Sequence, residues 1–283
     1  MARVVVTGGA GKLGRAVVTE LISYGWEVVV FDRVPCEAAG AVFVPVDLTD
    51  YGQVLDALHG VEERYDRVDA VVHLAAVPAP GIVPDQATFA NNMNATHHVF
   101  TAARRAGVKN IVWASSETVL GLPFDTPPPY LPVDEEYPPR PESTYSLVKT
   151  LEERMAAELC RWDPALKMVG LRFSNVMEPA DYAAFPSFDA DARLRKWNLW
   201  GYIDARDGAQ AVRLGLESDR TGMEVYIIAN ADTVMSRPNA ELVAEVFPGV
   251  EIRGELGVND TLLSIAKARA QLGYEPRFSW REQ

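Results

Sequence analysis

The stretch that most constrains the fold is VVVTGGAGKLG, residues 4–14. Three consecutive valines predict a buried strand, the glycines predict a tight turn, and apolar residues recur at helical spacing over residues 12–24. A strand that passes through a short turn directly into a helix is the first half of a crossover between parallel strands. The stretch therefore predicts an α/β fold that begins with this unit.

The glycine spacing indicates what the turn binds. Gly8, Gly11 and Gly14 are each separated by two residues. Glycine lets a backbone adopt positive φ or approach a ligand closely, and the helix start beyond the turn offers free N–H groups and a positive dipole end. Such a turn binds a pyrophosphate, so we expect a dinucleotide here. The alternative is a glycine-rich turn that binds nothing.

A carboxylate follows the next predicted strand, where a dinucleotide would place its adenosine ribose. Residues 27–31, EVVVF, read as this strand, and Asp32 stands at its end. A carboxylate there accepts hydrogen bonds from both ribose hydroxyls and repels a 2′-phosphate, which favours NAD over NADP. Lys12, Arg15 and Arg33 are each able to bind a 2′-phosphate, so NADP is the less favoured alternative.

Charge and composition exclude several classes of protein. The net charge of −12 argues against nucleic acid and anionic membranes as partners, because both need basic patches. Two cysteines form no metal or disulfide pattern, as expected in a reducing cytoplasm. No apolar run approaches membrane-spanning length, and the chain passes almost at once into a strand. We therefore expect a cytoplasmic protein without a metal.

Strand patterns alternate with helical patterns along most of the chain. This alternation predicts a Rossmann-type doubly wound parallel sheet, whose ligands gather at the carboxyl ends of the strands. We expect an NAD-binding Rossmann domain over residues 1–175 and a small substrate-binding lobe over residues 176–283, from which strand 224–229 and nearby helices return to the Rossmann sheet. Further strands are expected at 41–46, 69–75, 109–114 and 167–173, and helices at 51–60, 86–106, 143–159, 205–216, 238–247 and 262–272.

Residues 121–141 form a segment of a different kind. They contain eight prolines. Proline lacks the N–H that a helix interior or an inner strand needs, so the segment cannot be either. We expect a rigid loop that folds over a site.

Four polar residues within the predicted helices and strands need separate interpretation. Asp47 either reaches the adenine amino group or caps the helix at 51–60, and the sequence leaves both open. His73 has apolar neighbours on both sides, which indicates a core histidine with satisfied hydrogen bonds. His97 and His98 are adjacent on a helix, so they point in different directions and do not form a two-histidine metal site.

The residues that carry chemistry follow the fifth predicted strand. Tyr145 and Lys149 are four residues apart and therefore lie on one helical face. An ammonium beside a phenol favours the phenolate, which allows Tyr145 to exchange protons nearer neutral pH. Ser116 follows strand 109–114 at the carboxyl edge of the sheet, where its hydroxyl can hold a substrate oxygen near Tyr145.

Together these features resemble an extended short-chain dehydrogenase/reductase of the NAD-dependent epimerase/dehydratase family, and in size the uronate dehydrogenase-like members. The resemblance covers about three quarters of the chain, in the expected order. The motifs that carry it are TGGAGKLG (7–14), Asp32, HLAA (73–76), NMNAT (92–96), SSETVLG (115–121), YSLVK (145–149), RFSNVMEP (172–179) and YIDARD (202–207).

The resemblance implies a role for each site residue. Tyr145 would be the catalytic acid/base, Lys149 would bind the nicotinamide ribose and lower the tyrosine pKa, and Ser116 would orient the substrate oxygen. Asn94 resembles the family's structural asparagine, and Arg172 would face a substrate carboxylate. The cofactor would contact Gly8, Gly11, Lys12, Leu13, Asp32, Asp47, Leu48, Leu74, Ala75, Ala76, Asn91, Tyr145 and Lys149. The substrate would contact Ser116, Glu117, Arg172 and Asn175.

Departures from the family pattern narrow the activity. Family dehydratases carry Thr-Asp-Glu where this chain has Ser-Glu-Thr at 116–118, so one of two acids is absent and dehydration is disfavoured. Only about 22 residues separate Pro179 from Tyr202, where sugar-nucleotide enzymes of the family insert a longer segment. A small sugar or sugar acid therefore fits better than a UDP-sugar. The basic and indole side chains of residues 192–200 are expected to pack rather than bind sugar.

These observations predict an NAD-dependent oxidoreductase that transfers hydride at a carbinol carbon of a sugar or sugar acid. The first alternative is a UDP-glucose 4-epimerase-like enzyme that never releases its NAD. The second is a dinucleotide-sensing protein without chemistry. Helices 86–106 and 143–162 resemble the pair that forms the family's dimer interface, so we expect a homodimer.

Overall fold

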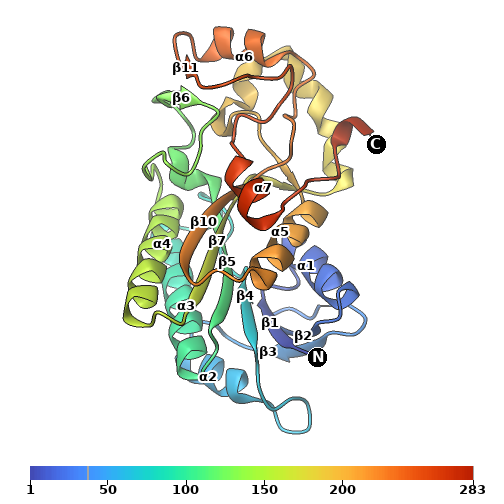
Figure 1. Ribbon diagram of the computed structural model, residues 1–283, viewed down its shortest axis with the longest axis vertical. Helices are drawn as coiled ribbons and strands as arrows, with labels where there is room; N and C mark the ends of the chain where they lie inside the picture. The colour runs from blue at the N-terminus through green and yellow to red at the C-terminus, as the bar shows by residue number, and fades with distance from the viewer. Residues whose placement is uncertain (37, 283) are drawn as a thin grey trace.

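The computed structural model describes residues 1–36 and 38–282. Its centre is a seven-stranded sheet in the order β10-β7-β5-β4-β1-β2-β3, and all neighbouring strands are parallel (Figure 1). The predicted doubly wound α/β sheet is thereby confirmed. Its strands are β1 (Arg3–Thr7), β2 (Glu27–Asp32), β3 (Val42–Pro45), β4 (Ala70–His73), β5 (Asn110–Ser116), β7 (Lys167–Phe173) and β10 (Gly222–Ile228).

Helices cover both faces of this sheet (Figure 1). Side chains alternate between the faces of a strand. Val4 and Val6 of β1 accordingly belong to the core that contains α1 and α5, whereas Val5 belongs to the core that contains α2, α3 and α4. All three valines are buried, as a sheet covered on both faces requires. The helices are α1 (Lys12–Ser23), α2 (Tyr51–His59), α3 (Asp85–Arg105), α4 (Thr144–Trp162) and α5 (Ala205–Glu217).

The chain order reverses at the centre of the sheet, between β1 and β4. From β1 the chain continues outward to β2 and β3, and from β4 it continues in the opposite direction to β5 and β7. Crossover connections leave the carboxyl ends of β1 and β4 toward opposite sides, which opens a crevice for a ligand. Thr7, His73 and Ser116 end the strands β1, β4 and β5 at this edge.

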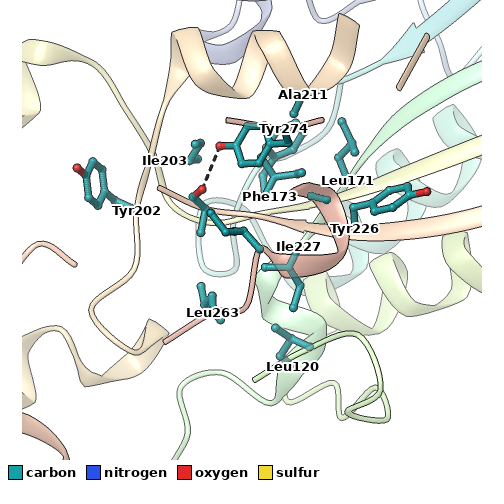
Figure 2. Packing of buried hydrophobic residues seen from close by; sticks show 14 of the residues in the cluster. Leu120, Leu171, Phe173, Tyr202, Ile203, Ala211, Tyr226, Ile227, Leu263 and Tyr274 are labelled. Carbon is teal, nitrogen blue, oxygen red and sulfur yellow. Dashed lines mark hydrogen bonds between the residues drawn. The ribbon is translucent and has the colours of Figure 1, made fainter. Parts of the chain in front are cut away.

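The later part of the chain gathers at one end of the sheet (Figure 1). Close packing joins it to the sheet: Figure 2 shows Tyr274 and Leu263 beside residues of β7 and β10, and the Tyr274 hydroxyl donates to the Ala229 carbonyl at 3.0 Å. The elements here are β6 (Tyr130–Leu131), β8 (Val176–Met177), β9 (Ile203–Asp204), β11 (Glu251–Ile252), α6 (Asn239–Val246), α7 (Ala266–Leu272) and a 3₁₀ segment (Pro179–Ala190).

Two predictions about this part of the chain have opposite outcomes. The proline-rich segment, residues 121–141, contains no helix and no strand of the main sheet, as predicted. Its one strand is the two-residue β6, which pairs with β11 in a separate two-stranded sheet. The helix predicted over residues 262–272 is wrong in its first turn, because α7 begins at Ala266. The backbone at 262–264 instead bonds with Val133 of the proline-rich segment, since the Leu262 carbonyl accepts from Val133 and Ser264 donates back to it. Within the described chain, no helix is long and apolar enough to cross a bilayer.

Candidate active site

The start of α4 places Tyr145 at the edge of the sheet. The Ser143 hydroxyl accepts from the Ser146 N–H at 3.1 Å, and the Ser146 hydroxyl accepts from the Ser143 N–H at 2.9 Å. This reciprocal capping begins the helix at Thr144. Tyr145 therefore lies in the first turn, and Lys149 follows one turn later with its Nζ 5.9 Å from the Tyr145 ring centre.

Tyr145 and Lys149 are both buried, and burial is the largest of the effects that raise the pKa of the Tyr145 phenol. The Lys149 ammonium and the Ser116 hydroxyl oppose this rise, while the nearby carboxylates of Glu152 and Glu117 add to it, and the net shift is upward. The raised pKa keeps Tyr145 in its phenol form near neutral pH, and positive charge added to the site would lower this pKa.

Ser116 is oriented to donate its proton. Its Oγ accepts from the Thr118 N–H at 3.1 Å and from the Thr118 hydroxyl at 3.0 Å, in the turn that follows β5. A serine hydroxyl has two acceptor positions and one proton. With both acceptor positions used, the Ser116 proton is left for Tyr145 or for an oxygen bound beside it.

The glycine turn fits a pyrophosphate. Gly8 has a φ of +72°, and a Cβ on it would lie 2.7 Å from the Ala75 backbone nitrogen. A Cβ on Gly14 would lie 2.1 Å from the Gly8 carbonyl oxygen, so only glycine allows the turn to close this tightly on α1. Gly11 caps α1 with no side-chain hydrogen bond, and the first turn of α1 has no acidic residue. The N–H groups of Lys12 and Leu13 at the helix start are therefore directed at the space where a phosphate would bind.

Carboxylates from after β8 hold the two cations nearest this turn. Lys12 Nζ lies 2.6 Å from Asp181, and Arg15 Nη2 lies 2.8 Å from Glu178. Both pairs are partly exposed. Their effect is to connect the start of α1 to the segment that follows β8.

Asp32 is the last residue of β2, and Asp47 follows the end of β3 by two residues. Asp32 accepts from the Ala10 N–H at 3.1 Å and from the Arg33 N–H at 2.7 Å, which anchors it beside the glycine turn. Asp47 accepts from both the N–H and the hydroxyl of Thr49, while Asp50 caps α2 by accepting from Gln53. The capping alternative for Asp47 is therefore wrong, because Asp50 is the residue adjacent to the helix, and contact with adenine remains a prediction.

The segment after β4 lines the turn from the other side. The N–H groups of Leu74 and Ala75 bond with the Thr7 hydroxyl at 3.2 and 3.3 Å, and Ala76 follows them. The side chain of Asn92 fixes the continuation by bonding both the N–H and the carbonyl of Val77. Among the other predicted contacts, Leu48 is buried after β3, Leu13 lies in the first turn of α1, and Asn91 bonds with Asn92.

The resemblance implied that Asn94 is the structural asparagine, but in the structure Asn92 has this position. Asn94 is exposed, whereas Asn92 is fully buried and holds the loop after β4. They are two positions apart in the helix, with only Met93 between them, so they lie on different sides of α3. His73 is confirmed as a core histidine, since both of its ring nitrogens have hydrogen-bond partners.

A second group of buried polar side chains lies beyond Ser116. The Glu117 carboxylate accepts from the Ser174 hydroxyl at 2.6 Å and from the Asn198 amide at 3.2 Å. Burial raises the pKa of Glu117 to about 7, against the opposing effect of these hydrogen bonds and of Arg195. Arg195 donates to Asn175 Oδ1 at 3.3 Å and to the Gly201 carbonyl at 2.9 Å.

Two arginines have surroundings that differ from those expected of them. Arg172 forms a buried two-point ion pair with Glu153, at 2.9 and 2.8 Å, so the structure does not support the prediction that it binds a substrate carboxylate. Arg195 comes from a segment expected only to pack. It is buried over the Trp197 ring, and in the described chain it has no carboxylate within ion-pair distance. Packing is confirmed for Trp200, which is completely buried. The sequence offered Arg195 only as the less favoured alternative, a guanidinium that pairs with a sugar, because the 3₁₀ turns here have no helical or strand period that would distinguish it.

The fold and the site define the class of protein. A parallel doubly wound sheet, a glycine turn between β1 and α1, and a Ser–Tyr–Lys cluster at the carboxyl edge are features of the short-chain dehydrogenase/reductase superfamily. Within it, the chain belongs to the NAD dependent epimerase/dehydratase family, whose model matches residues 4–229. The members of this family are enzymes that depend on NAD.

Relatives of known name support this membership. The chain is 30% identical to a UDP-glucose 4-epimerase of Bacillus subtilis (strain 168) over 181 residues, which are 61% of this chain and 52% of that protein. It therefore spans about half the length of the curated relatives it matches. A solved short-chain dehydrogenase/reductase superfamily protein from Agrobacterium tumefaciens with bound NAD is 26% identical, with a TM-score of 0.73 over 99% of this chain and 94% of that one. A mutated uronate dehydrogenase, 23% identical with a TM-score of 0.68 over 99% and 84%, shares the fold.

Proposed function

We propose that the protein is an NAD-dependent oxidoreductase acting at a carbinol carbon of a sugar or sugar acid. The observation that carries the proposal is the cluster of Ser116, Tyr145 and Lys149 at the carboxyl edge of the sheet, beside a turn that fits a pyrophosphate. Bound NAD would supply the hydride acceptor. Every other part of the reaction falls to side chains of this chain.

Tyr145 accepts the proton of the substrate hydroxyl. The Lys149 ammonium stabilises the phenolate that this requires, and the Ser116 proton bonds the substrate oxygen as it becomes a carbonyl. The C–H bond of the same carbon breaks with its electron pair, so a two-electron oxidation and the loss of one proton balance. Because the resting Tyr145 is protonated, turnover should rise with pH.

Asp32 supports NAD rather than NADP. Its carboxylate stands at the end of β2, and a 2′-phosphate would bring negative charge against it. Lys12 and Arg15, two of the three cations that the sequence left available to a 2′-phosphate, are paired with Asp181 and Glu178. The third, Arg33, is exposed, so NADP is the less favoured alternative rather than an excluded one.

The polar side chains that lie beyond Ser116 favour a small polar substrate. Glu117 and Arg195 are buried beside the half-buried Asn175, and Arg195 has hydrogen-bond capacity left because its Nε has no partner in the described residues. A guanidinium in this state fits the carboxylate of a sugar acid. Arg195 replaces Arg172 in that proposed role.

Epimerisation is the second candidate, supported by the 30% identity to a UDP-glucose 4-epimerase. Both reactions begin with the same oxidation. They differ in whether the hydride returns to the substrate and whether NAD leaves the protein.

One experiment separates the candidates. Purified protein is incubated with NAD and a panel of sugars, sugar acids and UDP-sugars, and nicotinamide absorbance is followed together with product identity. Net NADH with a small sugar or sugar acid supports the dehydrogenase. An isomerised product without net NADH contradicts it in favour of the epimerase, and silence of the whole panel contradicts both.

We further propose a homodimer formed through α3 and α4. Leu147, Leu151 and Trp162 are large apolar side chains exposed on α4, and a second copy would cover them. Light scattering on the wild type and on Leu151→Glu tests this assignment. A monomeric wild type at micromolar concentration would contradict it.

A further inference from the structure

α4 carries a buried carboxylate that the proposed chemistry does not use. Glu152 lies three residues after Lys149 and is completely buried. Its Oε2 lies 2.9 Å from Lys149 Nζ, and its Oε1 accepts from the Thr96 hydroxyl of α3 at 2.8 Å. A buried carboxylate is costly unless it is paired and hydrogen-bonded, so such a group on a helix face packed against the sheet has a specific role.

The contacts of Glu152 extend into a chain of hydrogen bonds with one direction. The Thr7 hydroxyl accepts from the N–H groups of Leu74 and Ala75, so its own proton is free for His73 Nδ1, 2.7 Å away. His73 then carries its proton on Nε2 and donates to the Thr96 hydroxyl at 3.0 Å. Thr96 in turn donates to Glu152.

This direction leaves Glu152 as an acceptor at both oxygens, which is the carboxylate form. Burial lowers the pKa of His73 to about 3, so the neutral ring that the chain requires is the form present at neutral pH. The chain crosses β1, β4, α3 and α4 and ends at the N–H groups of residues 74–75. A Cβ on Gly8 would touch the backbone of Ala75, so this end of the chain adjoins the glycine turn.

Glu152 also determines how Lys149 is held. An ammonium has three protons. One goes to the Ala114 carbonyl at 2.8 Å and one to Glu152, which leaves the third for the site. Without Glu152, only the Ala114 carbonyl would fix the ammonium.

We propose that Glu152 is a positioning residue that anchors the Lys149 ammonium and couples it, through Thr96 and His73, to the segment that borders the glycine turn. The inference rests on the proposed function, because it concerns the lysine of that site. It goes beyond it by assigning a role to a carboxylate that touches neither substrate nor cofactor.

The negative charge of Glu152 makes the role measurable. Burial and this charge both raise the pKa of Tyr145, while Lys149 lowers it. Removing the charge should therefore lower the Tyr145 pKa. The charged and titratable groups that face Tyr145 and Lys149 are Glu152 and Glu153 of α4, Glu117 after β5, His73 of β4, and Arg172 of β7, which neutralises Glu153.

The test compares Glu152→Gln with Glu153→Gln. Both remove a buried carboxylate from the same helix, but Glu153 bonds Arg172 and Ser115 rather than Lys149. Tyr145 ionisation is read in cofactor-free protein as the tyrosinate absorbance that disappears when Tyr145→Phe is added to each variant. The pH dependence of kcat/KM and the KM for NAD are measured in parallel.

For Glu152→Gln we expect Tyr145 ionisation and the acid limb of kcat/KM to move about one pH unit lower, and the KM for NAD to rise about tenfold. Glu153→Gln should lose thermal stability without moving Tyr145 ionisation. An unmoved Tyr145 in folded Glu152→Gln, or an equal shift in Glu153→Gln, would overturn the inference.

Two further outcomes are separable. If Glu152→Gln does not fold, Thr96→Val tests the same chain of hydrogen bonds, because Glu152 then loses a donor and a larger fraction of it is protonated. A downward shift of the Tyr145 ionisation that is less than half as large supports the inference. The absence of any shift overturns it. If Tyr145 ionisation shifts while no panel alcohol is oxidised by any variant, the positioning role stands and the proposed function fails.

Discussion

The two halves of the candidate site are built in different ways. The cofactor half is backbone: glycines at 8–14 and the first N–H groups of α1, all within one short stretch. The proposed substrate half is a set of polar side chains from three separate segments, which hydrogen-bond to their neighbours: the buried Glu117, Arg195 and Asn198 and the half-buried Asn175. A site made of backbone groups loses binding when a substitution adds a side chain that fills it. A site made of side chains loses binding when a substitution removes one of the hydrogen-bonding groups.

The largest expected effect tests whether the two halves serve one reaction. Tyr145 lies between them, and Tyr145→Phe removes the proton acceptor without changing the fold. We expect NADH formation with the active substrate to fall by about 10²- to 10⁴-fold, because general acid–base catalysis contributes an acceleration in that range. NAD affinity, measured by calorimetry, should be unchanged. Retained turnover would show that Tyr145 is not the proton acceptor and would contradict the view that the two halves serve one reaction.

The second prediction sharpens the description of the cofactor half as backbone. Gly14→Ala places a Cβ 2.1 Å from the Gly8 carbonyl oxygen and should cost at least about 3 kcal/mol of unfolding free energy, measured with urea. The matched control is Gly11→Ala, whose nearest atom is 3.3 Å away. It should fold normally and lose at least about tenfold in NAD affinity, because the methyl group obstructs the pyrophosphate. Equal stability of the two variants would contradict this description.

The third prediction addresses the substrate half alone. Arg195→Gln should raise the KM for a sugar acid by about 10- to 100-fold, since a hydrogen bond between charged groups contributes about 1.5–3 kcal/mol. The KM for NAD should not change, because Arg195 is buried among Asn175, Gly201 and Trp197. The control is Arg193→Gln, since Arg193 is exposed and paired with Glu245. A parallel rise in both Michaelis constants would refute the division into halves.

The last prediction concerns the pH dependence of stability. Because burial raises the pKa of Glu117 to about 7, above its unfolded value near 4.5, the folded state binds the Glu117 proton more tightly. Its contribution is complete below pH 4.5 and is lost as pH rises through 7. Glu117→Gln removes this loss, so its stability relative to wild type should improve by up to about 3 kcal/mol between pH 4.5 and 8 in urea unfolding. A pH-independent difference would show that the pKa of Glu117 is not raised in the folded protein.

The cofactor half was predictable because its information is local. Three valines, a glycine turn and a helical period are adjacent in the chain, and each follows from backbone sterics and side-chain periodicity. The same reasoning correctly predicted the parallel sheet. It failed at residues 262–265, where apolar spacing suggested a helix and hydrogen bonds to Val133 hold an extended backbone instead.

The substrate half was predictable only in part. Arg172 and Arg195 are equally basic in the sequence, and the one expected to be free is paired with Glu153. A buried guanidinium takes whichever carboxylate the fold brings near, and that choice depends on residues far apart in the chain.

The sequence by itself therefore determined the Rossmann-type sheet, the glycine turn between β1 and α1 and the Ser116, Tyr145 and Lys149 cluster, because periodicity, glycine sterics and helical spacing act over a few residues. The tertiary structure alone decided which buried charges are paired. Lys149 pairs with Glu152 and Arg172 with Glu153, whereas Arg195 has no carboxylate within ion-pair distance among the residues that the structure describes. These outcomes depend on which side chains the fold brings together, because most buried polar groups find their partners far away in the chain.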